Sequence, residues 1–196
     1  MKKLYTGLLL FFLILLGCSQ PKYNQPAIKI ETNFGDIILE LYPHKAPETV
    51  KAFLSFVDSG LYKNSSFYRV LKAEDQPSSS FKTDLIQGGI WQVDYKKQFS
   101  LKGIPLETTR ETGLHNVDGA ISLARTTANS GNCEFFICIG DQSAYDYGGK
   151  ANADGLGYAV FGKVVKGMDV VRQIQSQPDN ATTFTPPLLI KNIVRL

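Results

Sequence analysis

The pattern of apolar and polar residues divides the chain into a short apolar leader, a polar linker and a long strand-rich region. From residue 27 onward, apolar residues mostly alternate with polar ones, as in half-buried strands, and Gly or Asn clusters bound the runs. We expect strands at 28–30, 37–41, 66–71, 85–87, 120–124, 135–139, 158–165 and 188–196. The polar stretch 33–36 predicts a tight turn between the first two strands.

Two segments instead show the helical period. The first runs from about Pro47 to Ser59, with proline at the first helical position and an apolar stripe spaced i, i+3, i+4 and i+7. The second spans 167–175, with Asp169 in its first turn and its apolar residues on one face.

Strands far outnumber helices in this order, and both ends of the region are strands that could pair. The 196 residues suit one well-packed domain and are few for two. We therefore predict a mainly β domain at 27–196, an antiparallel barrel with helices over its open ends.

The leader, residues 1–17, has the layout of an export signal. Two lysines precede an uncharged apolar run at 8–16, which is short for a membrane-spanning helix. The ending Leu15-Leu16-Gly17-Cys18 resembles the bacterial lipobox, which implies cleavage before a lipidated Cys18. An ordinary secretory signal and an uncleaved anchor remain alternatives. Residues 18–26 would then form the lipidated cysteine and a tether of about 30 Å when extended.

Charge and cysteine content narrow the range of partners. Removing residues 1–17 takes away two lysines and no acids, so the formal charge falls from +3 to +1. This near-neutral balance argues against a nucleic-acid partner. Cys133 and Cys138 are five residues apart on one expected strand and point to opposite faces, so we expect two free thiols and neither a disulfide nor a metal site.

Several catalytic classes lack support. Only His44 and His115 can act as bases near neutral pH, and neither lies in a recognisable catalytic context. There is no G-x-S-x-G elbow, and the glycines at 148–149 lack the phosphate-loop spacing. The stretch 152–155 resembles part of a calcium loop, but Lys150 occupies the place of the first acidic ligand and no Glu follows in register. We expect no cofactor and no metal.

A set of motifs in family order resembles the cyclophilin family of peptidyl-prolyl isomerases, in particular its bacterial exported branch. The resemblance covers nearly all of residues 27–196, and it implies an eight-stranded antiparallel barrel capped by two helices. The motifs are Ala46-Pro47-Glu48-Thr49-Val50, Phe67-Tyr68-Arg69-Val70, Gln87-Gly88-Gly89, 120–124, Glu134-Phe135-Phe136-Ile137, 160–164 and 167–171.

The resemblance also implies a site. Arg69 matches the catalytic arginine, Gln87 the residue that binds substrate backbone and positions it, and Ala124-Arg125 the segment that pairs with the peptide. Phe136 with Leu85 would face the proline pocket while Phe135 packs inside the barrel. Further groove residues are Glu134, Tyr145 and Tyr158.

The chemistry needs no catalytic base. Rotation about an X–Pro bond must overcome roughly 20 kcal/mol of lost amide resonance, and no covalent bond breaks. A fixed donor aimed at the proline nitrogen stabilises the twisted state more than either planar one. A guanidinium suits this role because it stays charged and holds its donors in one plane.

The chain departs from the family at several positions. Tyr68 stands where many members have His, and Glu134 replaces the usual Gln, which offers a partner to Arg69 or Arg125. Asp84 occupies the place of a pocket phenylalanine, which Phe81 would fill only if the insert 72–83 folds back. Trp91 is not at the family's tryptophan position, to which Tyr145 or Tyr147 comes nearest, so cyclosporin-type affinity is in doubt.

We therefore predict a monomeric peptidyl-prolyl isomerase. It would be held on a membrane of the bacterial envelope through Cys18 and would act on proline-containing segments of exported proteins. The alternative is a membrane-bound scaffold that binds proline peptides without accelerating their isomerisation.

Overall fold

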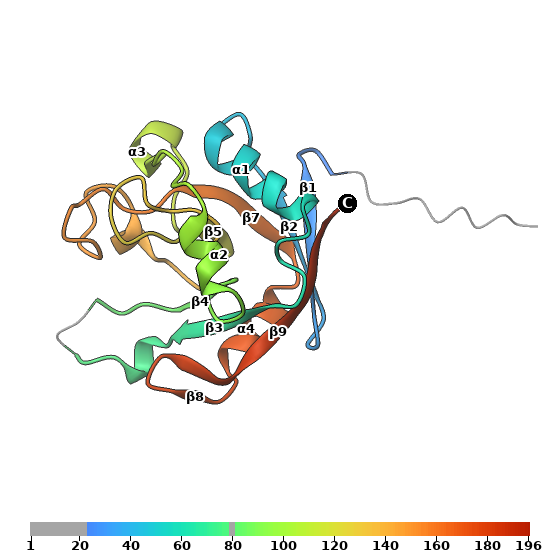
Figure 1. Ribbon diagram of the computed structural model, residues 1–196. Coiled ribbons are helices and arrows are strands. Elements are labelled where there is room, and N and C mark those ends of the chain that lie inside the picture. The colour runs from blue at the N-terminus through green and yellow to red at the C-terminus, as the bar shows by residue number, and fades with distance from the viewer. Residues whose placement is uncertain (1–22, 79–80) are drawn as a thin grey trace, which may run out of the picture.

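Eight strands pair into a closed antiparallel ring in this computed structural model, which describes residues 23–78 and 81–196 (Figure 1). Around the ring the order is β1-β2-β7-β5-β6-β4-β3-β9, and β9 pairs back onto β1. The strands are β1 (Ala27–Thr32), β2 (Asp36–Leu41), β3 (Ser65–Leu71), β4 (Leu85–Gly89), β5 (Ala120–Leu123), β6 (Phe135–Cys138), β7 (Val160–Lys166) and β9 (Thr183–Arg195). The two-residue β8 (Asp179–Asn180) pairs with β9 outside the ring. The predicted eight-stranded barrel is confirmed.

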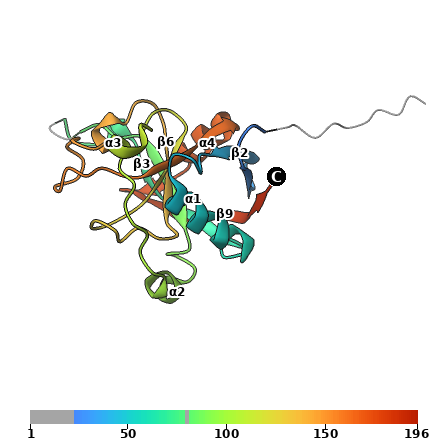
Figure 2. The same cartoon turned by 90° about the horizontal axis from the view of Figure 1, so that it is seen from above.

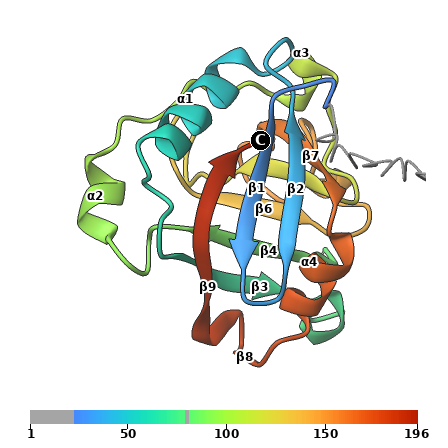
Figure 3. The same cartoon turned by 90° about the vertical axis from the view of Figure 1, so that its right-hand side faces the viewer.

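The first and last strands close the barrel, as the sequence predicts. Ile28 lies opposite Arg195 and Ile30 opposite Ile193, and the Leu196 amide donates to the Ala27 carbonyl at 3.0 Å. Figure 3 shows β9, β1 and β2 side by side. Since each of these strands has a partner on both sides, the ring presents no open edge there.

The two predicted helices are α1 (Pro47–Asp58) and α4 (Met168–Gln175), and both bury the apolar face that the period indicated. The sequence analysis missed two short helices, α2 (Tyr95–Ser100) and α3 (Thr109–Thr112). Neither is long enough to repeat the helical period. Their start signals were nevertheless present: Asp94 caps α2 by accepting from the Lys97 amide, and Thr108 with Glu111 forms a capping box on α3.

Aromatic rings fill the barrel beneath α1. Phe53 packs against Tyr62, Phe135 and Phe161 at centroid distances of 5.0–5.8 Å. The Tyr62 hydroxyl donates to the Cys133 carbonyl at 2.9 Å, which satisfies its polar group in this buried position.

One strand boundary differs clearly from prediction: β9 begins at Thr183, whereas we expected a strand from 188. Pro186 and Pro187 fall in the added part. Because proline cannot donate to a strand ladder, its presence argued against a strand in sequence. β7 likewise begins at Val160, which leaves Tyr158 just before the strand.

Within residues 23–78 and 81–196, no helix combines the length and the apolar character needed to cross a membrane. The predicted leader and the lipidation site at Cys18 fall in residues 1–22, outside the described residues.

Candidate active site

Arg69 and Gln87 face each other across β3 and β4, and their side chains are hydrogen-bonded. Arg69 Nη1 donates to Gln87 Oε1 at 2.9 Å, and Gln87 Nε2 donates to the Tyr68 hydroxyl at 2.6 Å. Tyr68 and Arg69 are adjacent, so a regular strand would point them to opposite faces. The register of β3 shifts between Phe67 and Arg69, and this irregularity lets both side chains reach Gln87.

The neighbouring strand β6 supplies an aromatic floor. Phe136 lies opposite Gln87 in the ladder and belongs to a small apolar cluster with Leu85, whereas Phe135 packs in the barrel core, as predicted. Tyr158 meets the Phe136 ring edge-on at 5.1 Å, and Tyr145 lies 5.7 Å from it. These contacts leave Phe136 only 3% exposed.

Tyr145 belongs to the same aromatic cluster. Its ring lies 5.0 Å from that of Tyr158. Burial raises the pKa of its phenol, while nearby Thr83 and Arg69 act in the opposite direction. Tyr145, and not the outward Tyr147, is therefore the tyrosine that borders the candidate groove. Tyr147 is 40% exposed and stacks with Arg110.

Glu134 does not pair with either arginine, which corrects one expectation. Its Oε1 accepts hydrogen bonds from the backbone amides of Ile90 at 2.9 Å and Trp91 at 3.1 Å. The side chain is buried beneath the end of β4, where Gly89 leaves it room. Glu134 thus holds the chain where it leaves β4, and its predicted contact with substrate stays a prediction.

Burial also governs the ionisation of Glu134 and its neighbour Tyr68. Desolvation raises the pKa of the Glu134 carboxyl, and its hydrogen bonds only partly offset this effect. Burial, and then the adjacent Glu134 carboxyl, raise the pKa of the Tyr68 phenol. Tyr68 therefore stays a neutral phenol whose oxygen is available to Gln87.

Arg125 is held by an internal ion pair with Asp154. Its guanidinium donates to both carboxylate oxygens of Asp154, at 2.7 and 2.9 Å, and its Nε donates to the Gly157 carbonyl at 2.7 Å. The side chain is 2% exposed and lies over the Tyr158 ring. The pair lowers the pKa of Asp154 to about 2. A peptide could therefore contact Arg125 only through its backbone atoms.

The insert before β4 does not supply a pocket phenylalanine in this structure. Phe81 is 51% exposed. Asp84 instead accepts hydrogen bonds from the Ala73 amide and from Gln175 of α4, so it fixes the base of the insert. The aromatic character of the floor therefore comes from Phe136, Tyr145 and Tyr158.

Sequence reasoning missed two participants, the hydroxyl of Tyr68 and the carboxylate of Asp154. The departure from His at Tyr68 was visible, but its partner depends on the strand irregularity. Asp154 lies in the stretch 152–155, for which the sequence excluded a calcium loop but indicated no partner. Cys133 and Cys138 are free thiols and lie in different apolar clusters, as predicted from their spacing.

Comparisons with known proteins agree on one family. The family described as "Cyclophilin type peptidyl-prolyl cis-trans isomerase/CLD" matches residues 27–195. Peptidyl-prolyl cis-trans isomerase B of Escherichia coli (strain K12) is 36% identical over 149 residues, 76% of this chain and 83% of that protein. Peptidyl-prolyl cis-trans isomerase A of Dickeya dadantii (strain 3937) is 34% identical over 171 residues, 84% of this chain and 82% of that protein.

Solved structures support the same fold. A cyclophilin-type peptidyl-prolyl cis-trans isomerase of Cryptosporidium parvum superposes with a TM-score of 0.68 at 24% identity, covering 87% of this chain and 97% of that one. A second structure of that protein, in the presence of the dipeptide Ala-Pro, gives a TM-score of 0.66.

Proposed function

Because the chain belongs to the cyclophilin-type peptidyl-prolyl cis-trans isomerase family, we propose that Arg69 is the donor that lowers its rotational barrier. The activity itself follows from the family: the protein catalyses cis–trans rotation about X–Pro bonds. The observation that carries the residue assignment is the hydrogen bond between Arg69 and Gln87.

The proposed mechanism follows from the geometry. As the bond twists, the proline nitrogen regains its lone pair and becomes a hydrogen-bond acceptor. Gln87 accepts from Arg69 Nη1, and this contact holds the guanidinium plane while leaving other N–H donors of the group free. No proton or covalent bond is exchanged.

The proline ring would contact the aromatic floor made by Phe136, Tyr145 and Tyr158, with Leu85 beside it. Burial of an apolar ring there stabilises both isomers, so the floor supplies affinity, whereas Arg69 supplies the preference for the twisted state. Gln87 would also bind the peptide backbone.

Substitution of Arg69 tests this assignment. In a protease-coupled isomerisation assay, Arg69→Ala should lower kcat/KM about a hundredfold, because one preorganised donor at the twisted bond is lost. Arg172→Ala, which removes an exposed arginine of α4, is the matched control and should turn over normally. Undiminished turnover in Arg69→Ala would refute the role. Peptide binding without any acceleration in the wild type would favour the scaffold alternative.

The proposed setting is the bacterial envelope, with the domain outside the cytoplasm and anchored through a lipid on Cys18. The sequence of residues 1–18 supports it. Labelled palmitate fed to expressing cells should enter the wild type and not Cys18→Ser. Equal labelling of both chains, or none of the wild type, would contradict the anchor.

A further inference from the structure

The chain leaves the barrel between β4 and α3 and forms α2, in which no residue is buried. Figures 2 and 3 show α2 standing apart from the strands. Nevertheless this segment contains four large apolar side chains, all of them exposed: Trp91 (40%), Val93 (54%), Tyr95 (55%) and Phe99 (69%). Such a gathering on one outlying element marks an interaction surface.

Polar contacts of the backbone and of polar side chains hold the segment 91–99 in place and leave its apolar side chains exposed. The Trp91 amide is bonded to buried Glu134, Asp94 caps α2, and Gln98 Nε2 donates to the Asn132 side chain at 3.2 Å. Phe99 lies one helical turn after Tyr95 and meets the Trp91 ring at 5.4 Å. The backbone is thus fixed by polar contacts while the aromatic rings point to solvent.

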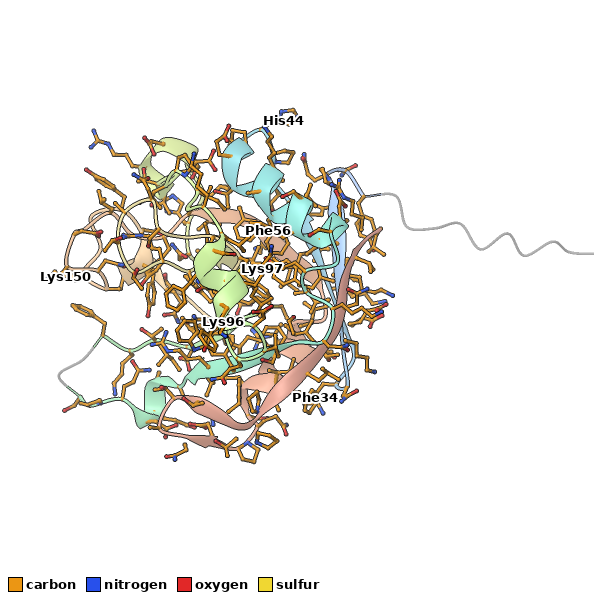
Figure 4. The ribbon with its side chains drawn as sticks, in the orientation of Figure 1. Phe34, His44, Phe56, Lys96, Lys97 and Lys150 are labelled. Carbon is orange, nitrogen blue, oxygen red and sulfur yellow. The ribbon has the colours of Figure 1, made fainter. Side chains whose placement is uncertain are left out.

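Positive charge lies on the same segment. Lys96, Lys97 and Lys102 are exposed, and Figure 4 shows the first two on α2. Within the described ranges none of the three makes an ion pair, and the one acid of the stretch 91–102, Asp94, accepts from the Lys97 amide. We name the four apolar residues and three lysines together the α2 surface.

We propose that the α2 surface docks onto an anionic lipid bilayer, the membrane to which the chain is tethered; this rests on the proposed anchor at Cys18. Tryptophan and tyrosine favour the headgroup region, where an apolar ring and a polar tip are both accommodated. Lysine stems lie along apolar surface while their ammonium groups reach anionic headgroups. Exposed aromatic rings beside lysines without ion pairs on one segment match this chemistry.

Docking of α2 would set the orientation of a domain that the anchor alone only holds near the membrane. Attachment at a single point does not fix which face of a domain meets the bilayer, whereas attachment plus a docked helix does. Asn132, which is bonded to α2, lies two positions from Glu134 at the edge of the candidate site. Docking would therefore hold the groove at a constant orientation to the membrane.

Trp91 makes the test direct because it is the only tryptophan of the chain. The full-length lipidated protein is reconstituted in phosphatidylcholine vesicles with or without phosphatidylglycerol, and bromine-labelled lipids serve as quenchers. With phosphatidylglycerol, Trp91 emission should shift to shorter wavelength and be quenched. The shift and the quenching should both weaken in vesicles without phosphatidylglycerol and at high salt.

Matched variants separate the α2 surface from general effects. Lys96→Glu with Lys97→Glu should abolish the quenching, and Phe99→Ser should weaken it. Lys163→Glu with Lys166→Glu, an equal charge change on β7, and Val165→Ser, at another exposed apolar position, should leave it intact. All four chains should isomerise a soluble peptide normally, which shows that each is folded.

The outcomes distinguish docking from anchoring. Flotation of the vesicles reports the anchor independently of Trp91. Protein that floats with water-like, unquenched Trp91 emission overturns the docking and leaves the anchor standing. Protein that does not float contradicts the proposed anchor. Docking can then still be tested by adding anionic vesicles to the protein and measuring whether Trp91 is quenched. Equal quenching in both lipid mixtures, or a blue shift on raising protein concentration without lipid, which indicates self-association, also overturns the proposal.

Discussion

A guanidinium can stabilise a twisted proline bond only if its donors point in a fixed direction, and Gln87 provides that constraint for Arg69. The amide of Gln87 is itself oriented, because its nitrogen donates to the Tyr68 hydroxyl while its oxygen accepts from Arg69. Because both ends of the amide are hydrogen-bonded, flipping or rotating the amide would break these bonds. The orientation of Arg69 therefore depends on a phenol that need not touch the substrate.

Tyr68→Phe tests this dependence. Removing the hydroxyl leaves Gln87 Nε2 without its acceptor, so Arg69 should lose part of its orientation. We expect kcat/KM to fall about fivefold, the equivalent of one net hydrogen bond of ~1 kcal/mol, with the fall mainly in kcat. Tyr147→Phe, at an exposed tyrosine, is the control. Unchanged kcat in Tyr68→Phe would show that Gln87 holds Arg69 unaided.

Glu134→Gln should change how stability depends on pH. The folded pKa of Glu134 is raised above its ordinary 4.5, so the folded state binds its proton more tightly than the unfolded state. This contribution is fully present below pH 4.5 and is lost as pH rises through the folded pKa. The free energy of unfolding of Glu134→Gln, measured by denaturant titration, should therefore rise relative to wild type as pH increases above 4.5. A constant difference across pH would contradict the raised pKa.

The sequence predicts the role of a single residue best where that role depends on the type of side chain and not on a distant partner. Arg69, Gln87 and Phe136 were identified from their motifs, and the structure brings all three together. Arg125 and Glu134 were also in motifs, but their partners come from loops and backbone distant in sequence. Such pairings follow from the folded path of the chain, which local pattern does not specify.

At the scale of elements, the end of β4 is shaped by close packing around Gly89. This residue has φ +148°, and a Cβ placed there would lie 2.2 Å from Glu134 Oε2. Both the backbone conformation and the lack of a side chain are required for Glu134 to bind the amides of Ile90 and Trp91.

Gly89→Ala should therefore destabilise the protein by about 3 kcal/mol, measured as the free energy of unfolding in denaturant. Gly60→Ala is the matched control: its φ is +70°, but nothing lies within 4 Å of the added Cβ, so it should cost about 1 kcal/mol. Equal losses in the two variants would mean that backbone strain alone, and not the contact with Glu134, sets the cost.

Element prediction succeeded where a period repeats and failed where it does not. α1 and α4 run for at least two turns and show their apolar stripes in sequence. α2 has six residues and no buried face, so no hydrophobic period exists to be found. The start of β9 was hidden by two prolines, which are tolerated because other residues of the strand complete its ladder.

For the whole molecule, the decisive contact is the pairing of β1 with β9. It joins the two ends of the domain, and Arg195 adds an ion pair to Asp58 at the end of α1. The sequence predicted this closure because both ends read as strands, although the strand order around the ring could not be deduced without the long-range pairings.

Removing residues 192–196 should therefore open the barrel. We expect the truncated chain to lose its cooperative thermal transition by circular dichroism, because β1 would lose most of its partner and expose an apolar edge. Removing Leu196 alone, which is 52% exposed, should lower the midpoint only slightly. A cooperative transition in the longer truncation would show that the other seven strands fold without closure.

The same closure has a consequence for the timing of folding. Strand pairs formed between the two ends of a chain have the largest possible loop to close, and such contacts slow folding. During synthesis β1 emerges before β9, its partner in the closed barrel. We therefore expect the isomerase to be inactive until β9 has been made, and on our proposal the barrel closes only after β9 has crossed the membrane, beside the proteins that it serves.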